Sequence, residues 1–276
     1  MTGPGRDAET GPEHGTGPEH GTGPEHGTGP EHGTGPEHGT GPEHGTGPGP
    51  RPATRPLLAL AALCATLFTA AAVTVAVRHG AALAPEQAVH HWALAHRGEP
   101  LRSVAGALTA TGSGPVPYLM AVLAGLLAGR GARGRLRAVV CTVAVLAVGQ
   151  AVRYGLMELL ARPRPTPADW AGRASGYSFP SGHATTSALA AGLLAWGIAR
   201  YAGRGRARTW CAVLALWAVA VGLTRVYLGV HWPGDVLGGW LLAGTVLSLA
   251  LLLERYVLPD RDAADGVPEP GGAGPV

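Results

Sequence analysis

The chain has 276 residues, of which 46% are hydrophobic and only 14% are charged. A long polar segment at the N-terminus lowers its mean hydropathy to +0.15, and the rest has the composition of a membrane protein. The formal net charge of +3 is carried by Arg, since the chain has no Lys, and is too small to indicate nucleic-acid binding. Three cysteines lie inside apolar runs, with the spacing of neither a metal site nor a disulfide framework: Cys64, Cys141 and Cys211.

The N-terminal segment is a tandem repeat. Residues 11–46 repeat GPEHGT, and residues 47–56 remain rich in Gly and Pro. Such a segment buries too little apolar surface to offset its conformational entropy, so we predict a disordered cytoplasmic tail over residues 1–55 and another over residues 255–276. A flexible tract with a histidine in each repeat could bind zinc or nickel loosely, but no cysteine or carboxylate arrangement closes a site. We therefore predict no metal site and no cofactor.

Six apolar runs are long enough, at about 1.5 Å per residue, to approach the roughly 30 Å of a bilayer core. They cover residues 56–77, 115–129, 138–160, 183–201, 209–228 and 236–253, of which 115–129 is the weakest. The first run lacks a nearby cleavage pattern and starts far from Met1, so it is predicted to be a membrane helix, not a signal peptide. We predict an all-α polytopic membrane protein, with six transmembrane helices forming a bundle over residues 56–254.

Short arginine-rich segments indicate the orientation of the bundle. Arginines precede the first run and lie between the second and third and between the fourth and fifth, which places them on one side of a six-helix bundle: Arg51, Arg55, Arg130, Arg133, Arg135, Arg137, Arg200, Arg204, Arg206 and Arg208. The positive-inside rule makes that side, and both termini, cytoplasmic. Residues 78–114, 161–182 and 229–235 then face outward. Within the first of these, residues 85–97 suit an interfacial helix, and we expect no catalytic or metal role for its histidines.

Two histidine motifs lie in the outward segments. In the first, Ser181, Gly182 and His183 precede an apolar run, so the free N–H groups of a helix N-terminus can bind an anion. Taken alone, Ser181 could equally be a helix N-cap and His183 an interfacial polar residue. In the second, Pro233 and Gly234 force a turn between His231 and Asp235.

That turn allows Asp235 to accept a hydrogen bond from the His231 ring and leave the other ring nitrogen free as a nucleophile. The alternatives are that Asp235 is an N-cap and that Arg225, which precedes this motif, snorkels at a helix end. A third element, Arg162-Pro163-Arg164-Pro165, holds two guanidinium groups suited to phosphate oxygens.

These three elements resemble the type 2 phosphatidic acid phosphatase superfamily, whose members include membrane lipid phosphatases, glucose-6-phosphatase and vanadium haloperoxidases. Its motifs are Lys, six residues, Arg-Pro; then Pro-Ser-Gly-His; then Ser-Arg, five residues, His, three residues, Asp. The chain has the second at residues 180–183 and the third from Thr224 to Asp235, with Thr in place of Ser. Of the first it keeps Arg164, but Met157 stands where the family has Lys. Arg153, one helical turn earlier, has a side chain long enough to reach the same space.

The resemblance implies a role for each matching residue. His231 attacks phosphorus to form a phosphohistidine, Asp235 orients it, and His183 protonates the leaving oxygen and later activates water. Arg164, Ser181, Gly182 and Arg225 would bind the phosphate, with Arg153 as a further candidate, and this binding needs no metal ion.

Together, the sequence predicts a cell-membrane enzyme with its site facing outward. It would hydrolyse a lipid phosphate or diphosphate of the undecaprenyl diphosphate, phosphatidate or phosphatidylglycerophosphate type. The bilayer and this lipid are the expected partners, nucleic acid is not, and the oligomeric state is left open. A non-catalytic protein that binds lipid phosphates and a lipid phosphotransferase are the alternatives. A transporter is disfavoured because the ionisable residues gather at helix ends, and a haloperoxidase because those relatives are soluble.

Overall fold

The computed structural model describes residues 54–257, with side chains to residue 254. Eight α-helices and one short 3-10 helix make up the regular structure of this part of the chain, which confirms the all-α prediction. The first helix begins at Thr54 and the last ends at Val257, so nearly all of both predicted tails, 1–55 and 255–276, lies outside the described residues.

A helix forms at each of the six predicted apolar runs. These helices are α1 (Thr54–Val77), α4 (Pro115–Ala128), α5 (Gly131–Leu160), α6 (Gly182–Tyr201), α7 (Arg204–Tyr227) and α8 (Pro233–Val257). By length and composition, α1, α5, α7 and α8 qualify as membrane spans among the described helices. A fifth span results when α4 is joined across a 48° bend to α3 (Leu101–Thr111), a short helix that the sequence did not indicate. The bend explains why the run at 115–129 is short.

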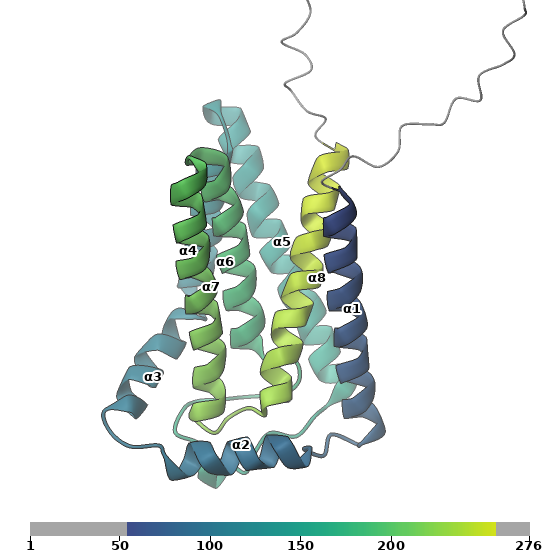
Figure 1. Cartoon of the computed structure of the whole chain (residues 1–276), viewed down its shortest axis with the longest axis vertical. Coiled ribbons are helices and arrows are strands. Elements are labelled where there is room, and N and C mark those ends of the chain that lie inside the picture. The colour runs from purple at the N-terminus through teal and green to yellow at the C-terminus, as the bar shows by residue number, and fades with distance from the viewer. Residues whose placement is uncertain (1–53, 258–276) are drawn as a thin grey trace, which may run out of the picture. The chain divides into compact units, whose positions relative to one another are not determined.

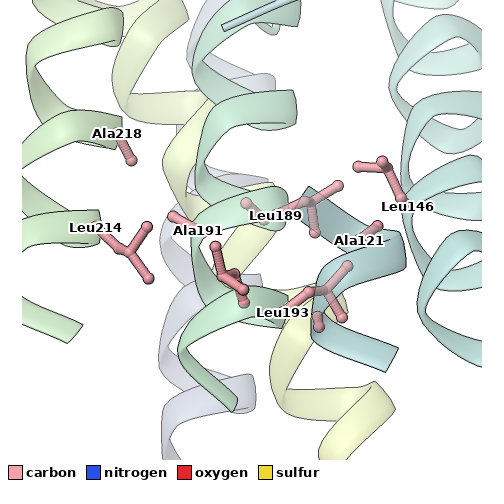
Figure 2. Close-up of a cluster of buried hydrophobic side chains, with 10 residues drawn as sticks. Ala121, Leu146, Leu189, Ala191, Leu193, Leu214 and Ala218 are labelled. Atoms are coloured by element: carbon pink, nitrogen blue, oxygen red, sulfur yellow. The ribbon is translucent and has the colours of Figure 1, made fainter. Parts of the chain in front are cut away.

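Helix α6 is not apolar enough to qualify as a membrane span by composition, because its first turns carry His183 and several hydroxyl side chains. It lies in the middle of the bundle, packed against α4, α5, α7 and α8, and ten of its 20 residues are buried. Its small and polar residues therefore face protein rather than lipid, where apolar character is not required. Figure 2 shows leucines and alanines from α4, α5 and α7 converging on α6 in the main hydrophobic cluster.

Small residues bring α6 very close to α4. A Cβ on Gly197 of α6 would lie 2.5 Å from the carbonyl oxygen of Ala124, so the two backbones touch at this point. Close backbone approach through glycine and alanine is a common basis of helix packing in membranes, where the hydrophobic effect between helices is weak. This packing fixes the position of α6, and with it the position of the histidine at its N-terminus.

The two ends of the bundle differ in what they carry (Figure 1). One end holds the start of α1, the end of α8 and the arginine-rich connections that join α4 to α5 and α6 to α7. The other end holds α2 (Ala84–Ala95), which lies across the bundle, the segment between α5 and α6 with the 3-10 helix η1 (Pro167–Asp169), and the α7–α8 turn. Both histidine motifs are therefore at the same end.

Candidate active site

The turn between α7 and α8 brings His231 and Asp235 together. His231 Nδ1 lies 3.3 Å from Asp235 Oδ2, and the two side chains are 2% and 0% exposed. Pro233 starts α8, and the Asp235 carboxylate also accepts a hydrogen bond from the backbone N–H of Trp232 at 2.8 Å. An aspartate at Nδ1 keeps the ring proton on that nitrogen, so Nε2 carries the free electron pair.

Asp235 is held by two residues beyond its own turn. Arg162 Nη1 donates to Asp235 Oδ1 at 2.6 Å, and the hydroxyl of Ser178 donates to Oδ2. All three side chains are buried. From the sequence, both Arg162 and Arg164 carried guanidinium groups suited to phosphate oxygens, but the structure places Arg162 behind the aspartate, where it pairs with Asp235 and Glu86.

Arg162 is itself held by Glu86 on the first turn of α2. Its Nη2 lies 2.6 Å from Glu86 Oε2, and its Nη1 lies 3.2 Å from Oε1. The same carboxylate accepts the backbone N–H groups of Leu83 at 2.8 Å and Gly234 at 3.0 Å. Burial lowers the pKa of Arg162, but Asp235 and Glu86 together raise it above its usual value, so the arginine stays charged.

Sequence reasoning missed Glu86 and Ser178. An acidic residue in the first turn of a helix is common because it interacts favourably with the helix dipole, so Glu86 carried no distinct signal. Ser178 precedes the Pro-Ser-Gly-His motif by two residues and looks like an ordinary loop residue. Both were detectable only as neighbours in space.

The environment of His231 keeps its ring neutral. Burial lowers the pKa of His231 to about 4, and although the hydrogen bond to Asp235 raises it, the positive charges of Arg164 and Arg225 lower it again. Near neutral pH the imidazole is therefore unprotonated and its Nε2 is available as a nucleophile or base.

The Pro-Ser-Gly-His turn packs directly against this pair. The backbone N–H of Ser181 donates to the backbone oxygen of Asp235 at 2.9 Å, which ties the start of α6 to the start of α8. Ser181 occupies the N-cap position, yet its buried hydroxyl makes no capping bond and has no partner among the described residues. His183, in the first turn of α6, is half-buried and close enough to His231, Arg164, Arg225 and Arg153 to experience their charges.

Arg153 on α5 occupies the space expected for the missing lysine. Its Nη1 lies 3.3 Å from the sulfur of Met157, so its side chain passes the position where the family has Lys. Its guanidinium carbon lies 3.4 Å from where a Cβ on Gly182 would be, which places the charge beside the Gly182 backbone. Arg153 is 6% exposed, and its buried Nε has no hydrogen-bond partner in the part of the chain that the structure describes.

Arg164 joins two loops and contacts the reactive nitrogen. Its guanidinium donates to the backbone oxygens of residues 175, 176, 177 and 230 at 2.8–3.0 Å, and its Nη1 lies 2.8 Å from His231 Nε2. One Arg164 N–H therefore points at the place where a group bound to Nε2 would sit. The other four hydrogen bonds make the guanidinium rigid.

Arg225, in the last turn of α7, approaches from the side of α3. It donates to Thr109 Oγ1 and to the backbone oxygen of Arg173, both at 3.1 Å, while its buried Nε has no partner within residues 54–254. Its neighbour Thr224, which matches the family serine, instead donates to the Val221 oxygen of its own helix at 2.6 Å. The threonine hydroxyl is thus satisfied within α7.

The three arginines that are predicted to bind phosphate all lack a carboxylate partner among the described residues. Among residues 54–254, no carboxylate forms an ion pair with Arg153, Arg164 or Arg225, although two are buried and one is half-buried. Buried charges normally have partners of opposite sign, and buried N–H and O–H groups are normally hydrogen-bonded. The unpartnered Arg153 Nε, Arg225 Nε and Ser181 Oγ near one histidine pair therefore indicate a site for an anion with several oxygens.

Of the histidines in and next to α2, His90 anchors the helix to the loops. His90 is buried, its Nε2 lies 3.1 Å from Asp169 Oδ2, and its ring packs against Trp232 at a centroid distance of 5.1 Å. His91 and His96 are exposed. Helix α2 is thus anchored to the loops around the site through His90 as well as Glu86.

Comparison with known proteins gives consistent results. Residues 136–258 match the family model of the PAP2 superfamily, a range that includes all the predicted site residues. An undecaprenyl-diphosphatase from Sulfolobus acidocaldarius is 31% identical over 127 residues, which cover 42% of this chain and 53% of the relative. Phosphatidylglycerophosphatase B from Escherichia coli K12 is 33% identical over 113 residues, 40% of this chain and 41% of the relative. The chain therefore spans about half of the curated relatives it matches.

A solved structure resembles the whole described bundle. The crystal structure of a transmembrane PAP2 type phosphatidylglycerolphosphate phosphatase from Bacillus subtilis superimposes with a TM-score of 0.61 at 25% sequence identity. The match covers 73% of this chain and 98% of that chain. The similarity thus extends beyond the motifs to the arrangement of the helices, and the protein is a membrane protein of this fold.

Proposed function

Because residues 136–258 carry a PAP2 superfamily domain, we propose that this chain is an integral membrane phosphatase acting on a lipid phosphate or diphosphate. The observation that carries the proposal is the pairing of a neutral, aspartate-bound histidine with three arginines that lack carboxylate partners among the described residues. A nucleophile beside an anion-binding pocket is the arrangement that phosphoryl transfer needs.

In the proposed mechanism, His231 Nε2 attacks the phosphorus while the bond from phosphorus to the lipid oxygen breaks. His183 gives its proton to that oxygen, then takes a proton from the water that cleaves the phosphohistidine. Asp235 stabilises the positive charge that develops on the His231 ring. The Arg164 N–H that contacts Nε2 then donates its hydrogen bond to a phosphoryl oxygen instead. Arg153, Arg225, the Ser181 hydroxyl and the Gly182 amide donate hydrogen bonds to the phosphoryl oxygens as well.

A lipid substrate follows from where the site lies. The phosphate ligands are at the end of the bundle that α2 crosses (Figure 1), and in a membrane bundle the ends of the helices lie near the lipid headgroups. The relatives named above act on an undecaprenyl diphosphate or a phosphatidylglycerophosphate, and phosphatidate belongs to the same chemical class. These three lipid types are the substrates we propose.

The test is phosphate release by the purified full-length protein in detergent, with the chelator EDTA present and a panel of these lipids. We expect release by the wild type and by His91→Ala, an exposed-histidine control on α2, and none by His231→Ala. An acid-labile phosphoryl group should be trapped on the wild type and be absent from His231→Ala. Binding of lipid phosphate without release would favour the non-catalytic alternative, and transfer of phosphate to an added alcohol in preference to water would favour the phosphotransferase.

We also propose that the site faces the outside of the cell and that both termini are cytoplasmic. The arginines of the α4–α5 and α6–α7 connections support this orientation through the positive-inside rule. In a cysteine-free background, an impermeant maleimide added to intact cells should label Ala168→Cys at the site end and spare Gly205→Cys at the other end. The reverse pattern would contradict the orientation without affecting the proposed chemistry.

A further inference from the structure

A groove opens on the side of the bundle between α7 and α8. Its volume is about 280 Å³, and its floor is α6, which contributes Ala188, Ala191 and Ala195. The α7 wall includes Leu214 and Ala218, which point from α7 toward Ala191 in Figure 2. Every lining residue is apolar or a small neutral residue, so the groove is a hydrophobic slot in the surface that faces the membrane.

The groove follows from how the three helices pack. Helices α7 and α8 each pack along α6, but they contact each other little and diverge from their common turn (Figure 1). The alanines on this face of α6 do not fill the space that remains between them. The outer rim carries the exposed α7 residues Ala215 and Val219, so the groove is open to the hydrocarbon region.

One end of the groove lies just beneath the candidate active site. Its wall there is Trp240 of α8, which packs against Ala184 and Val226, the residues that follow His183 and Arg225. At 1.5 Å per residue, the groove runs along α6 from about 8 Å to about 18 Å from His183. The groove therefore starts close to the phosphate site and continues toward the middle of the bilayer.

We propose that this groove binds one hydrocarbon chain of the phosphorylated lipid substrate, an inference that rests on the proposed function. A lipid whose phosphate lies among Arg153, Arg164 and Arg225 would extend its chains along the bundle axis, and the groove is a predominantly apolar slot in that direction, with the Trp240 indole at the end nearest the site. The acyl chain of a glycerolipid and an isoprenyl chain have the same chemistry here.

The groove acts by positioning the substrate. A lipid chain is already in an apolar medium, so moving it from the bilayer into the groove gains little from the hydrophobic effect. What it gains is van der Waals packing on one side and a restricted orientation of the attached phosphate. Filling the groove should therefore lower kcat/KM for long-chain lipids far more than for short-chain ones.

The first test uses Ala215→Trp, which fills the groove from its exposed rim, and Ala212→Trp, a control on α7 that is also exposed and lies outside the groove. For each, kcat/KM is measured on dioleoyl and dibutyryl phosphatidate, and on farnesyl and isopentenyl diphosphate. We expect Ala215→Trp to lower the long-to-short ratio at least about tenfold in the acyl or the isoprenyl pair, and Ala212→Trp to leave both ratios unchanged. Unchanged ratios in Ala215→Trp would overturn the proposal.

The second test does not depend on turnover. Cys211 lies in the groove, and with Cys64 and Cys141 replaced by Ala its alkylation by N-ethylmaleimide reports on occupancy. In detergent, dioleoyl phosphatidate should protect Cys211 at concentrations at least about fivefold lower than dioleoyl phosphatidylcholine, whose headgroup has no free phosphate end. Equal protection would show that ordinary lipid fills the groove and would refute the inference. Protection without any phosphate release would instead uphold the groove and refute the proposed enzyme.

Discussion

Glu86→Gln tests whether the network behind Asp235 holds the site together. The carboxylate of Glu86 accepts four hydrogen bonds, two from Arg162 and one each from the backbone N–H groups of Leu83 and Gly234. Glutamine has the same shape but offers a single acceptor oxygen, and its NH₂ group would face N–H donors. The substitution therefore removes a buried charge and leaves donors unsatisfied without creating a cavity.

The expected cost follows from the burial of the pair. The side chains of Arg162 and Glu86 are 2% and 9% exposed, and removing one partner of a buried ion pair costs about 3–5 kcal/mol. Arg162 keeps Asp235 as a partner, so we expect the lower value, about 3 kcal/mol. For a folded unit of this size that corresponds to a fall in Tm of about 6–12 °C. Because Gly234 and Arg162 lose their anchor beside Asp235, kcat/KM of the folded protein should also fall about tenfold, or about 1.4 kcal/mol.

The assay is thermal unfolding of the full-length protein in detergent, with kcat/KM measured well below the transition. Glu158→Gln is the matched control, because Glu158 is exposed on α5 and surface substitutions usually change stability by less than about 0.5 kcal/mol. Equal Tm shifts in the two variants would refute the account of the network. A lower Tm with unchanged kcat/KM would show that Glu86 supports the fold but does not position Asp235.

Further predictions concern the charges around the phosphate site. The pKa of His231 is lowered to about 4 by burial, so the acid limb of the kcat/KM profile should lie well below pH 6.5; a limb near 6.5 would contradict a buried neutral nucleophile. The pKa of His231 is lower in the folded protein than in the unfolded chain. The stability that His231 contributes should therefore be complete above pH 6.5 and be lost as the pH falls toward 4. This loss should appear as a fall in Tm with falling pH that is smaller in His231→Asn than in the wild type. Arg153→Leu should lower kcat/KM about 10–100-fold by removing a phosphate ligand, and unchanged kinetics would remove Arg153 from the site. Met157→Lys alone should not raise activity, because its ammonium would meet the Arg153 guanidinium, but it should partly rescue Arg153→Leu; an equally impaired double variant would show that the two positions are not equivalent.

Much of the architecture could be read from the sequence. Apolar runs predicted all six bundle helices, and arginine positions predicted which connections share an end. The exception is α3, which is only 11 residues long and joins α4 through Gly112 and Gly114, so it left no long apolar run. The sequence also marked α6 as a span, although its composition is too polar to qualify as one by itself.

The candidate site was predicted less completely. The motifs located His183, His231, Asp235 and the arginines, and spacing alone suggested the His231–Asp235 contact because a four-residue turn is local. The sequence showed only that Arg162 and Arg164 both carry guanidinium groups suited to phosphate, since two arginines that alternate with prolines look alike in sequence, and only the motif match singled out Arg164. Their environments differ because one guanidinium meets Glu86, 76 residues away in the chain, and the other meets the loops around residues 176 and 230.

The sequence by itself determined which stretches form long apolar helices and which residue types are available for phosphate chemistry, because hydropathy, charge and turn residues act over short stretches of chain. Only the tertiary structure decided that Glu86 and Arg162 support Asp235, that Arg153 lies beside Gly182, and that three polar atoms near the histidines lack partners among the described residues. It also decided that a groove lies below the site. These features arise where helices pack, and packing is set by the shapes of side chains that are distant in sequence.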